Sequence, residues 1–266
     1  MNLPVKLKWC MTLMAVFLAV FCVRMGMFVA HQTGDGRLQD VTLSYVVIDL
    51  VIGYTLIRAI WRILAQTYLS RKWLKLFRAA KHDKLTKRLT YKYRSLKTEI
   101  IVVRDEALVA LAIGMRRPKI VVSTAVLDTF SSEEVKAILL HEWHHCLNRD
   151  NAKMFLTTLL AEAFGYWPIM KPIFRYYRTW TELLADRFAI RQMGTELPLA
   201  SVLLKLSKLG NMQQHAASVH FAAAAMHYRI MQVLEPDKTV KVKLALLRPL
   251  LASISLLLLF MLSGDS

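Results

Sequence analysis

The feature that most constrains this chain is the motif H-E-x-x-H at residues 141–145. The motif lies in a segment that we expect to be helical, because Ser131 and Glu134 have the spacing of a capping box and no Gly or Pro follows before the motif ends. On such a helix His141 and His145 share one face, where two imidazoles can bind one zinc ion. The motif therefore predicts a metal site against this helix.

Two further residues of the motif have to be placed relative to that face. Glu142 lies about 60° around the helix from His145, close enough to act as general base on a water molecule at the metal. His144 could also neighbour His141, but it lies about 160° from Glu142, which would split the constellation. We therefore expect His145 to bind the metal and His144 to lie beside the ligands without binding it.

A metal site needs a third ligand, and residues 181–189 supply a candidate. Glu182 and Asp186 are four residues apart on a second expected helix. One of these carboxylates can bind the metal while the other orients a ligand imidazole. An E-x-x-x-D spacing alone is common, but together with H-E-x-x-H it predicts a zinc site.

The balance of charge and hydropathy indicates a membrane protein. The 266 residues include 36 Lys and Arg against 19 Asp and Glu, a net charge of +17, and 55% of them are hydrophobic. Such basicity could indicate nucleic-acid binding, but no motif supports it, and the long apolar runs favour a membrane protein with basic cytoplasmic surfaces. We expect the lipid bilayer, and no nucleic acid, as a partner.

Residues 1–62 are expected to form a transmembrane hairpin. Its two spans, about residues 9–30 and 41–60, are each long enough to cross a bilayer. Each span carries one charge at depth, Arg24 and Asp49, and antiparallel packing puts the two at similar depth. Because an unpaired charge inside a membrane is costly, we expect a structural Arg24–Asp49 ion pair, with a functional relay as the alternative.

The segment that follows is strongly basic and then β-like. Residues 63–98 are predicted to be a juxtamembrane helix whose lysines face anionic lipid, on the cytoplasmic side by the positive-inside rule. Residues 99–240 are expected to form the cytoplasm-facing metal domain. Short β-like runs at residues 100–103, 107–113 and 119–122 predict a small sheet packed against the metal helix. The edge of that sheet could hold an extended peptide by strand addition.

The apolar run between the two metal motifs cannot be a single crossing of the membrane. Glu182 would then emerge on the opposite side from His141 and His145, and no shared zinc site could form. We therefore expect residues 154–176 to be a helical hairpin that dips into the membrane and returns to the same face. A last span, about residues 244–262, leads out of the cytoplasm.

Together these features carry a resemblance to a known family. Residues 113–122, 132–134, 141–150 and 182–187 are similar to the motifs of the membrane gluzincin metallopeptidases. Within that family the order of spans favours the BlaR/MecR-type antirepressor peptidases over the HtpX-like and CAAX prenyl protease branch. The expected fold class is therefore a mainly α membrane protein with a small β-sheet, with an H-E-x-x-H zincin (gluzincin) domain on transmembrane helices.

The resemblance also implies roles for individual residues. It implies zinc ligands at His141, His145 and Glu182, catalysis by Glu142, and an orienting role for Asp186. The antibiotic sensors of the family carry a large extracellular domain after the last span. Here only residues 263–266 follow, so direct β-lactam sensing is not expected.

The resemblance implies a multi-pass zinc endopeptidase of the cell membrane with its active site on the cytoplasmic side. Its substrate would be a cytoplasmic transcriptional repressor, or the protein itself, cleaved in transmembrane signalling. An HtpX-like protease for membrane-protein quality control is the alternative within the family. A non-catalytic zinc-binding membrane receptor or scaffold is the alternative from another class, and the intact Glu142 argues against it.

Overall fold

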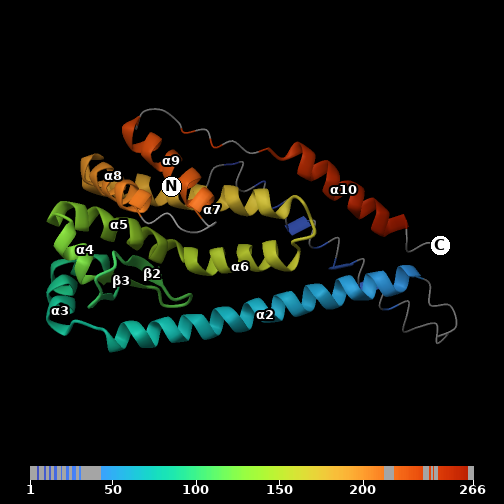
Figure 1. Ribbon diagram of the computed structural model, residues 1–266, viewed down its shortest axis with the longest axis horizontal. Helices are drawn as coiled ribbons and strands as arrows, with labels where there is room; N and C mark the ends of the chain where they lie inside the picture. Colours follow the sequence, from blue (N-terminus) through green and yellow to red (C-terminus); the bar gives the residue numbers. More distant parts are fainter. Residues whose placement is uncertain are drawn as a thin grey trace. The chain divides into compact units, whose positions relative to one another are not determined.

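The structure, a computed structural model, describes residues 43–212, 219–235 and 245–262, together with residues 240 and 242 and scattered positions between residues 5 and 30. These residues are mainly helical and include a three-stranded sheet, as expected (Figure 1). The chain divides into two compact units. The first is Met1–Ala65, Thr157–Tyr177 and Lys243–Ser266, and the second is Gln66–Leu156 and Arg178–Val242.

The elements that the structure describes are numbered in chain order. The helices are α2 (Leu43–Ala79), α3 (Asp83–Lys92), α4 (Thr124–Thr129), α5 (Ser132–Asn148), α6 (Asp150–Ala163), α7 (Met170–Met193), α8 (Leu197–Met212), α9 (Val219–Leu234) and α10 (Leu247–Leu262). A 3-10 helix, η1 (Arg94–Leu96), precedes the strands β1 (Ile100–Val103), β2 (Ala110–Ile113) and β3 (Lys119–Ser123).

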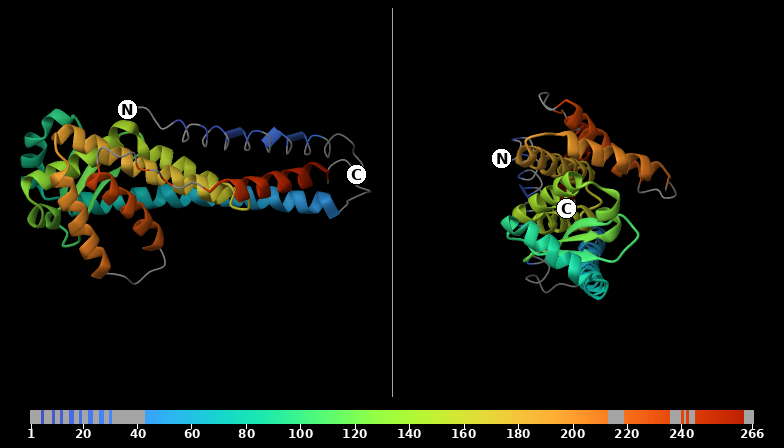
Figure 2. Two further views of the ribbon diagram at one scale, coloured as in Figure 1. Left: turned by 90° about the horizontal axis from the view of Figure 1, so that it is seen from above. Right: turned by 90° about the vertical axis from the view of Figure 1, so that its left-hand side faces the viewer.

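The sheet of the second unit has the order β1-β3-β2, with β1 parallel and β2 antiparallel to β3. Its side chains alternate between two faces. Ile100 and Val102 belong to the larger core that includes α5, whereas Ile101 and Val103 pack with Phe77 of α2 on the other face. Figures 1 and 2 show α5 beside β2 and β3, against which it packs. The sheet thus supports the helix that carries the H-E-x-x-H motif.

The start of α5 is anchored by a buried carboxylate. The expected capping box is confirmed: Ser131 Oγ accepts from the Glu134 N–H at 3.3 Å, and Glu134 Oε2 accepts from the Ser131 N–H at 2.7 Å. Ser201 and Lys205 of α8 also donate to the Glu134 carboxylate, Lys205 Nζ at 2.8 Å. Burial alone would raise the pKa of Glu134, but the hydrogen bonds from Lys205, Ser201 and Ser131 lower it to about 2.

The first unit is built around the turn between α6 and α7. Trp167 is 1% exposed and Ile169 is 0% exposed. The Ile169 N–H donates to Ser253 Oγ of α10 at 3.2 Å, and the Tyr166 hydroxyl lies 3.2 Å from Thr55 Oγ1 of α2. These polar contacts hold α2, the turn and α10 together. The dip of residues 154–176 into a membrane stays a prediction.

A charged cluster also lies in the first unit. Glu162 of α6 is 3.4 Å from an Arg62 nitrogen and 3.9 Å from an Arg58 nitrogen, both on α2. The pair that we expected, Arg24 with Asp49, lies outside the described residues because the placement of Arg24 is not described.

The membrane spans remain predictions. Among the described residues, no helix combines the length and the hydropathy of a membrane span. The first expected span, residues 9–30, lies outside the continuously described part of the chain. Residues 41–60 fall largely on α2, and residues 244–262 largely on α10.

The basic segment is divided rather than forming one helix. Residues 63–98 comprise the end of α2, then α3 and η1. The break has a local cause, because Lys81 bridges to Val103 of β1 and His82 Nδ1 accepts from the Leu85 N–H at the start of α3. The chain therefore leaves the α2 axis where it lines the edge of the sheet.

We expect Glu134→Gln to lower the free energy of unfolding by about 2 kcal/mol at pH 7, because a charged acceptor of several hydrogen bonds is lost. The folded-state pKa of Glu134, about 2, is below the ordinary value of 4.5. The stabilisation is therefore present above pH 4.5 and is lost as the pH falls towards about 2. Denaturant unfolding at pH 7 and pH 3 measures it, with the exposed Ser132→Ala as control. An equal difference from wild type at both pH values would contradict the assignment.

Candidate metal centre

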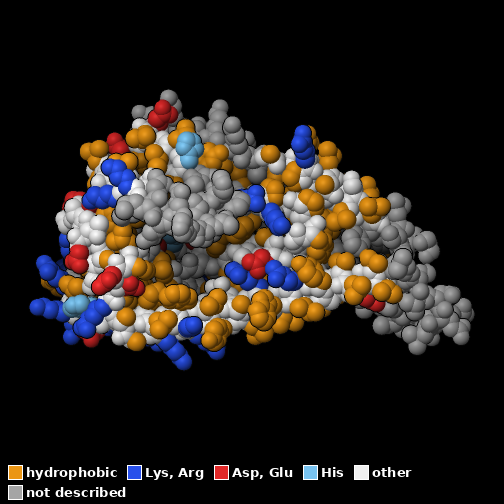
Figure 3. Space-filling model, in the orientation of Figure 1, with side chains coloured by type: hydrophobic (Ala, Val, Ile, Leu, Met, Phe, Trp, Pro, Cys, Tyr) orange, Lys and Arg blue, Asp and Glu red, His pale blue; other side chains and the backbone are white. Residues whose placement is uncertain are grey.

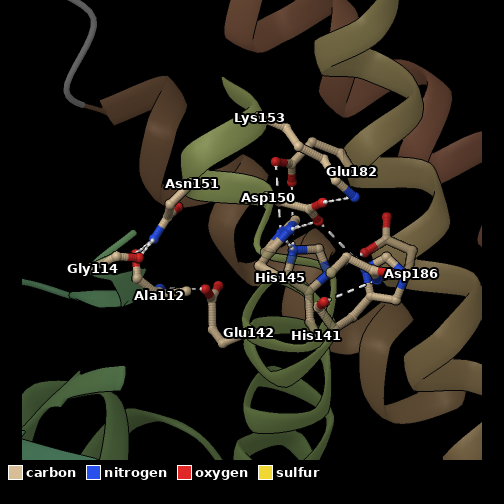
Figure 4. Close-up of polar contacts among 12 residues, drawn as sticks. Ala112, Gly114, His141, Glu142, His145, Asp150, Asn151, Lys153, Glu182 and Asp186 are labelled. Carbon is tan, nitrogen blue, oxygen red and sulfur yellow. Dashed lines mark hydrogen bonds and ion pairs between the residues drawn. The ribbon is translucent and has the colours of Figure 1, made fainter. Parts of the chain in front are cut away.

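Helices α5 and α7 bring the three expected ligands together. The Nε2 atoms of His141 and His145 lie 3.2 Å apart, and Glu182 oxygens lie 3.4 Å from the first and 3.9 Å from the second (Figure 4). Ligand atoms about 2.0–2.1 Å from a tetrahedral zinc ion are roughly 3.3 Å from one another. Small shifts would therefore let these atoms hold such an ion.

The outer nitrogen of each imidazole faces a carboxylate. His141 Nδ1 lies 2.8 Å from Asp186 Oδ1, and His145 Nδ1 lies 2.9 Å from Asp150 Oδ2. A carboxylate at this nitrogen fixes the ring and leaves Nε2 as the metal-binding atom. We expected an orienting role for Asp186 but did not assign Asp150. Its position depends on Arg149, which ends α5 in the left-handed conformation, φ 52°, so that α6 begins at once.

Arg229 of α9 balances the negative charge behind the ligands. Its Nε and one Nη lie 2.7 and 2.8 Å from the two Asp186 oxygens, and the other Nη lies 3.2 Å from a Glu182 oxygen. Asp186 is 0% exposed, and an unpaired carboxylate at such a position would be costly. We did not assign Arg229 to the site from the sequence. The available signal was an arginine within a largely apolar helix.

The carboxylate of Glu182 is ionised and ready to bind a cation. Burial alone would raise its pKa, but the contact with His141 and the charge of Arg229 hold that pKa well below its ordinary value. Two imidazoles and one ionised carboxylate form a donor set that zinc prefers. The residues present therefore fit the expected metal.

Glu142 lies beside the ligands, but its carboxylate is turned toward the sheet. Its Oε2 accepts a hydrogen bond from the Ala112 N–H of β2 at 2.7 Å (Figure 4). Burial raises the pKa of Glu142 above its ordinary value, against the opposing charges of His141 and His145. A raised pKa suits a carboxylate that has to take up and release a proton near neutral pH.

His144 is directed away from the three ligands. Its Nε2 lies 2.9 Å from Asn148 Nδ2, and its Nδ1 lies 3.7 Å from Asp150 Oδ2. Burial lowers the pKa of His144 to about 4, so its ring is neutral at pH 7. His144, His145 and Asp150 form a second possible ligand group. We favour the first group, because there both imidazoles offer Nε2 while an orienting carboxylate faces Nδ1, and Glu182 lies beside both Nε2 atoms as a third ligand.

Comparison with known proteins finds a family model that matches most of the chain. A family model described as BlaR1 peptidase M56 matches residues 10–233. The regulatory protein BlaR1 of Bacillus licheniformis is 26% identical over 101 residues, 37% of this chain and 17% of that protein. The protease HtpX homolog 2 of Methanosarcina mazei is 26% identical over 145 residues, 42% of this chain and 49% of that protein. The matches thus span less than half the length of each of these relatives.

We expect metal uptake by the metal-free protein to release protons. Burial and the charge of Arg229 lower the pKa of His141, but its contacts with Asp186 and Glu182 raise it overall to about 10. The imidazole is therefore protonated at pH 7 and has to lose a proton before Nε2 can bind an ion. The apparent zinc affinity should rise about tenfold per pH unit between about pH 7 and 9. Calorimetric titration in two buffers of different ionisation enthalpy measures this, and uptake without proton release would contradict it.

Asp186→Asn and Asp150→Asn should each lower the zinc affinity by roughly 10–100-fold, because each removes the carboxylate that orients a ligand imidazole. Competition with a chelating dye measures the affinity, and circular dichroism checks that the helices remain. Glu133→Gln, an exposed carboxylate on α5, serves as control. An unchanged affinity in either variant would show that this carboxylate does not support the metal ligands.

Proposed function

Because the chain belongs to the BlaR1 peptidase M56 family, we propose that it is an integral-membrane zinc endopeptidase with its active site on the cytoplasmic side. The observation that carries the proposal is the convergence of His141, His145 and Glu182 beside Glu142. Three protein ligands leave a fourth position open, which is typical of catalytic rather than structural zinc sites.

The chain's own residues divide the chemistry of peptide hydrolysis between them. When bound, zinc supplies the Lewis acidity that activates water and polarises the scissile carbonyl. Glu142 takes a proton from the attacking water on its carboxylate and returns it to the leaving amine nitrogen. Asp186 and Asp150 keep the two imidazoles oriented, and Arg229 compensates the charge of Asp186.

A membrane setting is supported by apolar side chains exposed along α2 and α10. Leu50, Ile57, Trp61, Leu247 and Leu259 are 62–72% exposed, and Figure 3 shows hydrophobic side chains following α2. Contiguous apolar surface of this kind marks contact with a membrane or a partner. We keep the expected topology, in which the basic residues of the segment 63–98 face anionic lipid headgroups.

As the physiological substrate we propose a cytoplasmic transcriptional repressor or the protein itself. Similarity to the regulatory protein BlaR1 supports this substrate, whereas similarity to the protease HtpX homolog 2 supports membrane-protein quality control. A comparison of the proteome of a Glu142→Gln strain with that of wild type separates the two. Accumulation of one repressor would support the first, and accumulation of many membrane proteins the second.

Glu142→Gln should retain zinc and lower kcat by roughly 10²–10⁴-fold, because the base is removed and the ligands are not. Cleavage of fluorescein-labelled β-casein by the detergent-solubilised protein, with zinc content measured in parallel, provides the test. His141→Ala is the matched comparison and should lose the metal as well as activity. Turnover near wild type in Glu142→Gln would exclude Glu142 as the base. A wild-type protein that binds zinc but cleaves nothing would favour the non-catalytic receptor or scaffold.

A further inference from the structure

The two outer edges of the sheet are closed in different ways. At β1 the main chain of the preceding segment closes the edge: the His82 N–H donates to the Val102 carbonyl and the Arg104 N–H to the Ala80 carbonyl, each at 2.8 Å. Thr86 Oγ1 accepts from the Val102 N–H at 3.0 Å. Opening this edge would require the chain between α2 and α3 to move.

At β2, the backbone N–H and C=O groups of alternate residues point away from the sheet. The Ser123 N–H of β3 donates to the Val109 carbonyl at 2.8 Å, so the backbone groups of the odd-numbered residues on this strand face β3. Those of Ala110, Ala112 and Gly114 therefore face away from the sheet. An added strand would have to pair with these outward groups.

Two side chains of the described residues form hydrogen bonds with these outward-facing backbone groups. Glu142 Oε2 accepts from the Ala112 N–H at 2.7 Å. Asn151 Nδ2 donates to the Ala112 carbonyl at 2.9 Å and to the Gly114 carbonyl at 3.3 Å (Figure 4). We call the contacts of Glu142 and Asn151 with Ala112 and Gly114 the β2 clasp. Unlike the closure of β1, the clasp can open by side-chain rotation alone.

We propose that the β2 clasp holds the peptide-binding edge closed, and that Asn151 is the residue whose release admits an extended peptide. The inference rests on the proposed function, because it takes the β2 edge as the place where the substrate binds. It adds a consequence for Glu142. A peptide carbonyl that accepts from the Ala112 N–H displaces the Glu142 carboxylate. Peptide binding at this edge therefore releases Glu142 to act as the general base.

The position of Asn151 suits this role. It lies in the first turn of α6, directly after Asp150, whose carboxylate faces His145. Its amide therefore reaches the sheet from a helix that is held against the metal ligands. If Asn151 were only a structural anchor, its substitution would weaken peptide binding or leave it unchanged. If Asn151 holds the edge closed, its substitution should strengthen peptide binding.

The test compares wild type with Asn151→Ala and the isosteric Asn151→Asp, which cannot donate. The full chain in detergent is stripped of metal with a chelator, and binding of fluorescein-labelled β-casein is measured by fluorescence anisotropy. The loss of two hydrogen bonds from the closed state should tighten binding about tenfold. With zinc present, KM should fall by a similar factor while kcat changes little. Gln192→Ala, which removes an exposed amide of α7, should behave as wild type.

Three other outcomes for peptide binding and hydrolysis would also be decisive. Unchanged or weaker binding in both Asn151 variants, with the thermal midpoint of wild type, would overturn the proposal and leave Asn151 as an anchor. Absence of binding in wild type and variants alike would overturn it too, since the β2 edge would then take no peptide. Tighter binding in the variants without hydrolysis by any zinc-loaded form would support the clasp and refute the peptidase.

Discussion

The second unit depends above all on the contacts of Asp186. This carboxylate has no exposed surface and lies between the guanidinium of Arg229 and the imidazole of His141. A buried charge costs several kcal/mol unless its neighbours compensate it, and here one residue from α9 and one from α5 compensate a residue of α7. The same contacts of Asp186 therefore hold three helices together and orient a metal ligand. A helix that slipped along its neighbours would leave a charge unpaired.

The parts of the molecule that follow a period or a fixed spacing were predictable from the sequence. The i, i+4 spacing that puts His141 and His145 on one helical face needs only helix geometry, and the capping box at Ser131 follows from two residue types. The three β-like runs became strands near the expected residues, because a short apolar run bounded by turn residues is itself the signal, although the middle strand begins only at Ala110. The assignment of Glu182 as the third ligand needed a further argument, namely that its carboxylate and the two histidines have to reach the same ion.

What escaped prediction depends on contacts that no local pattern encodes. Arg229 is 43 residues from Asp186, and nothing in the helix around it says which carboxylate it meets. The contact of Asp150 with His145 follows from one left-handed residue between two helices. Hydropathy likewise shows that a charge such as Glu162 lies in an apolar run, but not that two arginines of α2 flank it. The Arg24–Asp49 pair was inferred by the same reasoning and stays a prediction.

The occupied edges of the small sheet also bear on how copies of this chain behave when they meet. A strand with unpaired backbone groups is a template on which another chain can form a strand. Copies of this chain that lie close together would encounter one another often. Here the backbone of the segment before α3 shields β1, and the side chains on α5 and α6 shield β2. Among the described residues, the hydrogen bonds that shield β2 come from the side chains of Glu142 and Asn151. A molecule caught while that edge is open would be prone to join its sheet to that of a neighbour, so self-association is the hazard that accompanies access to this strand.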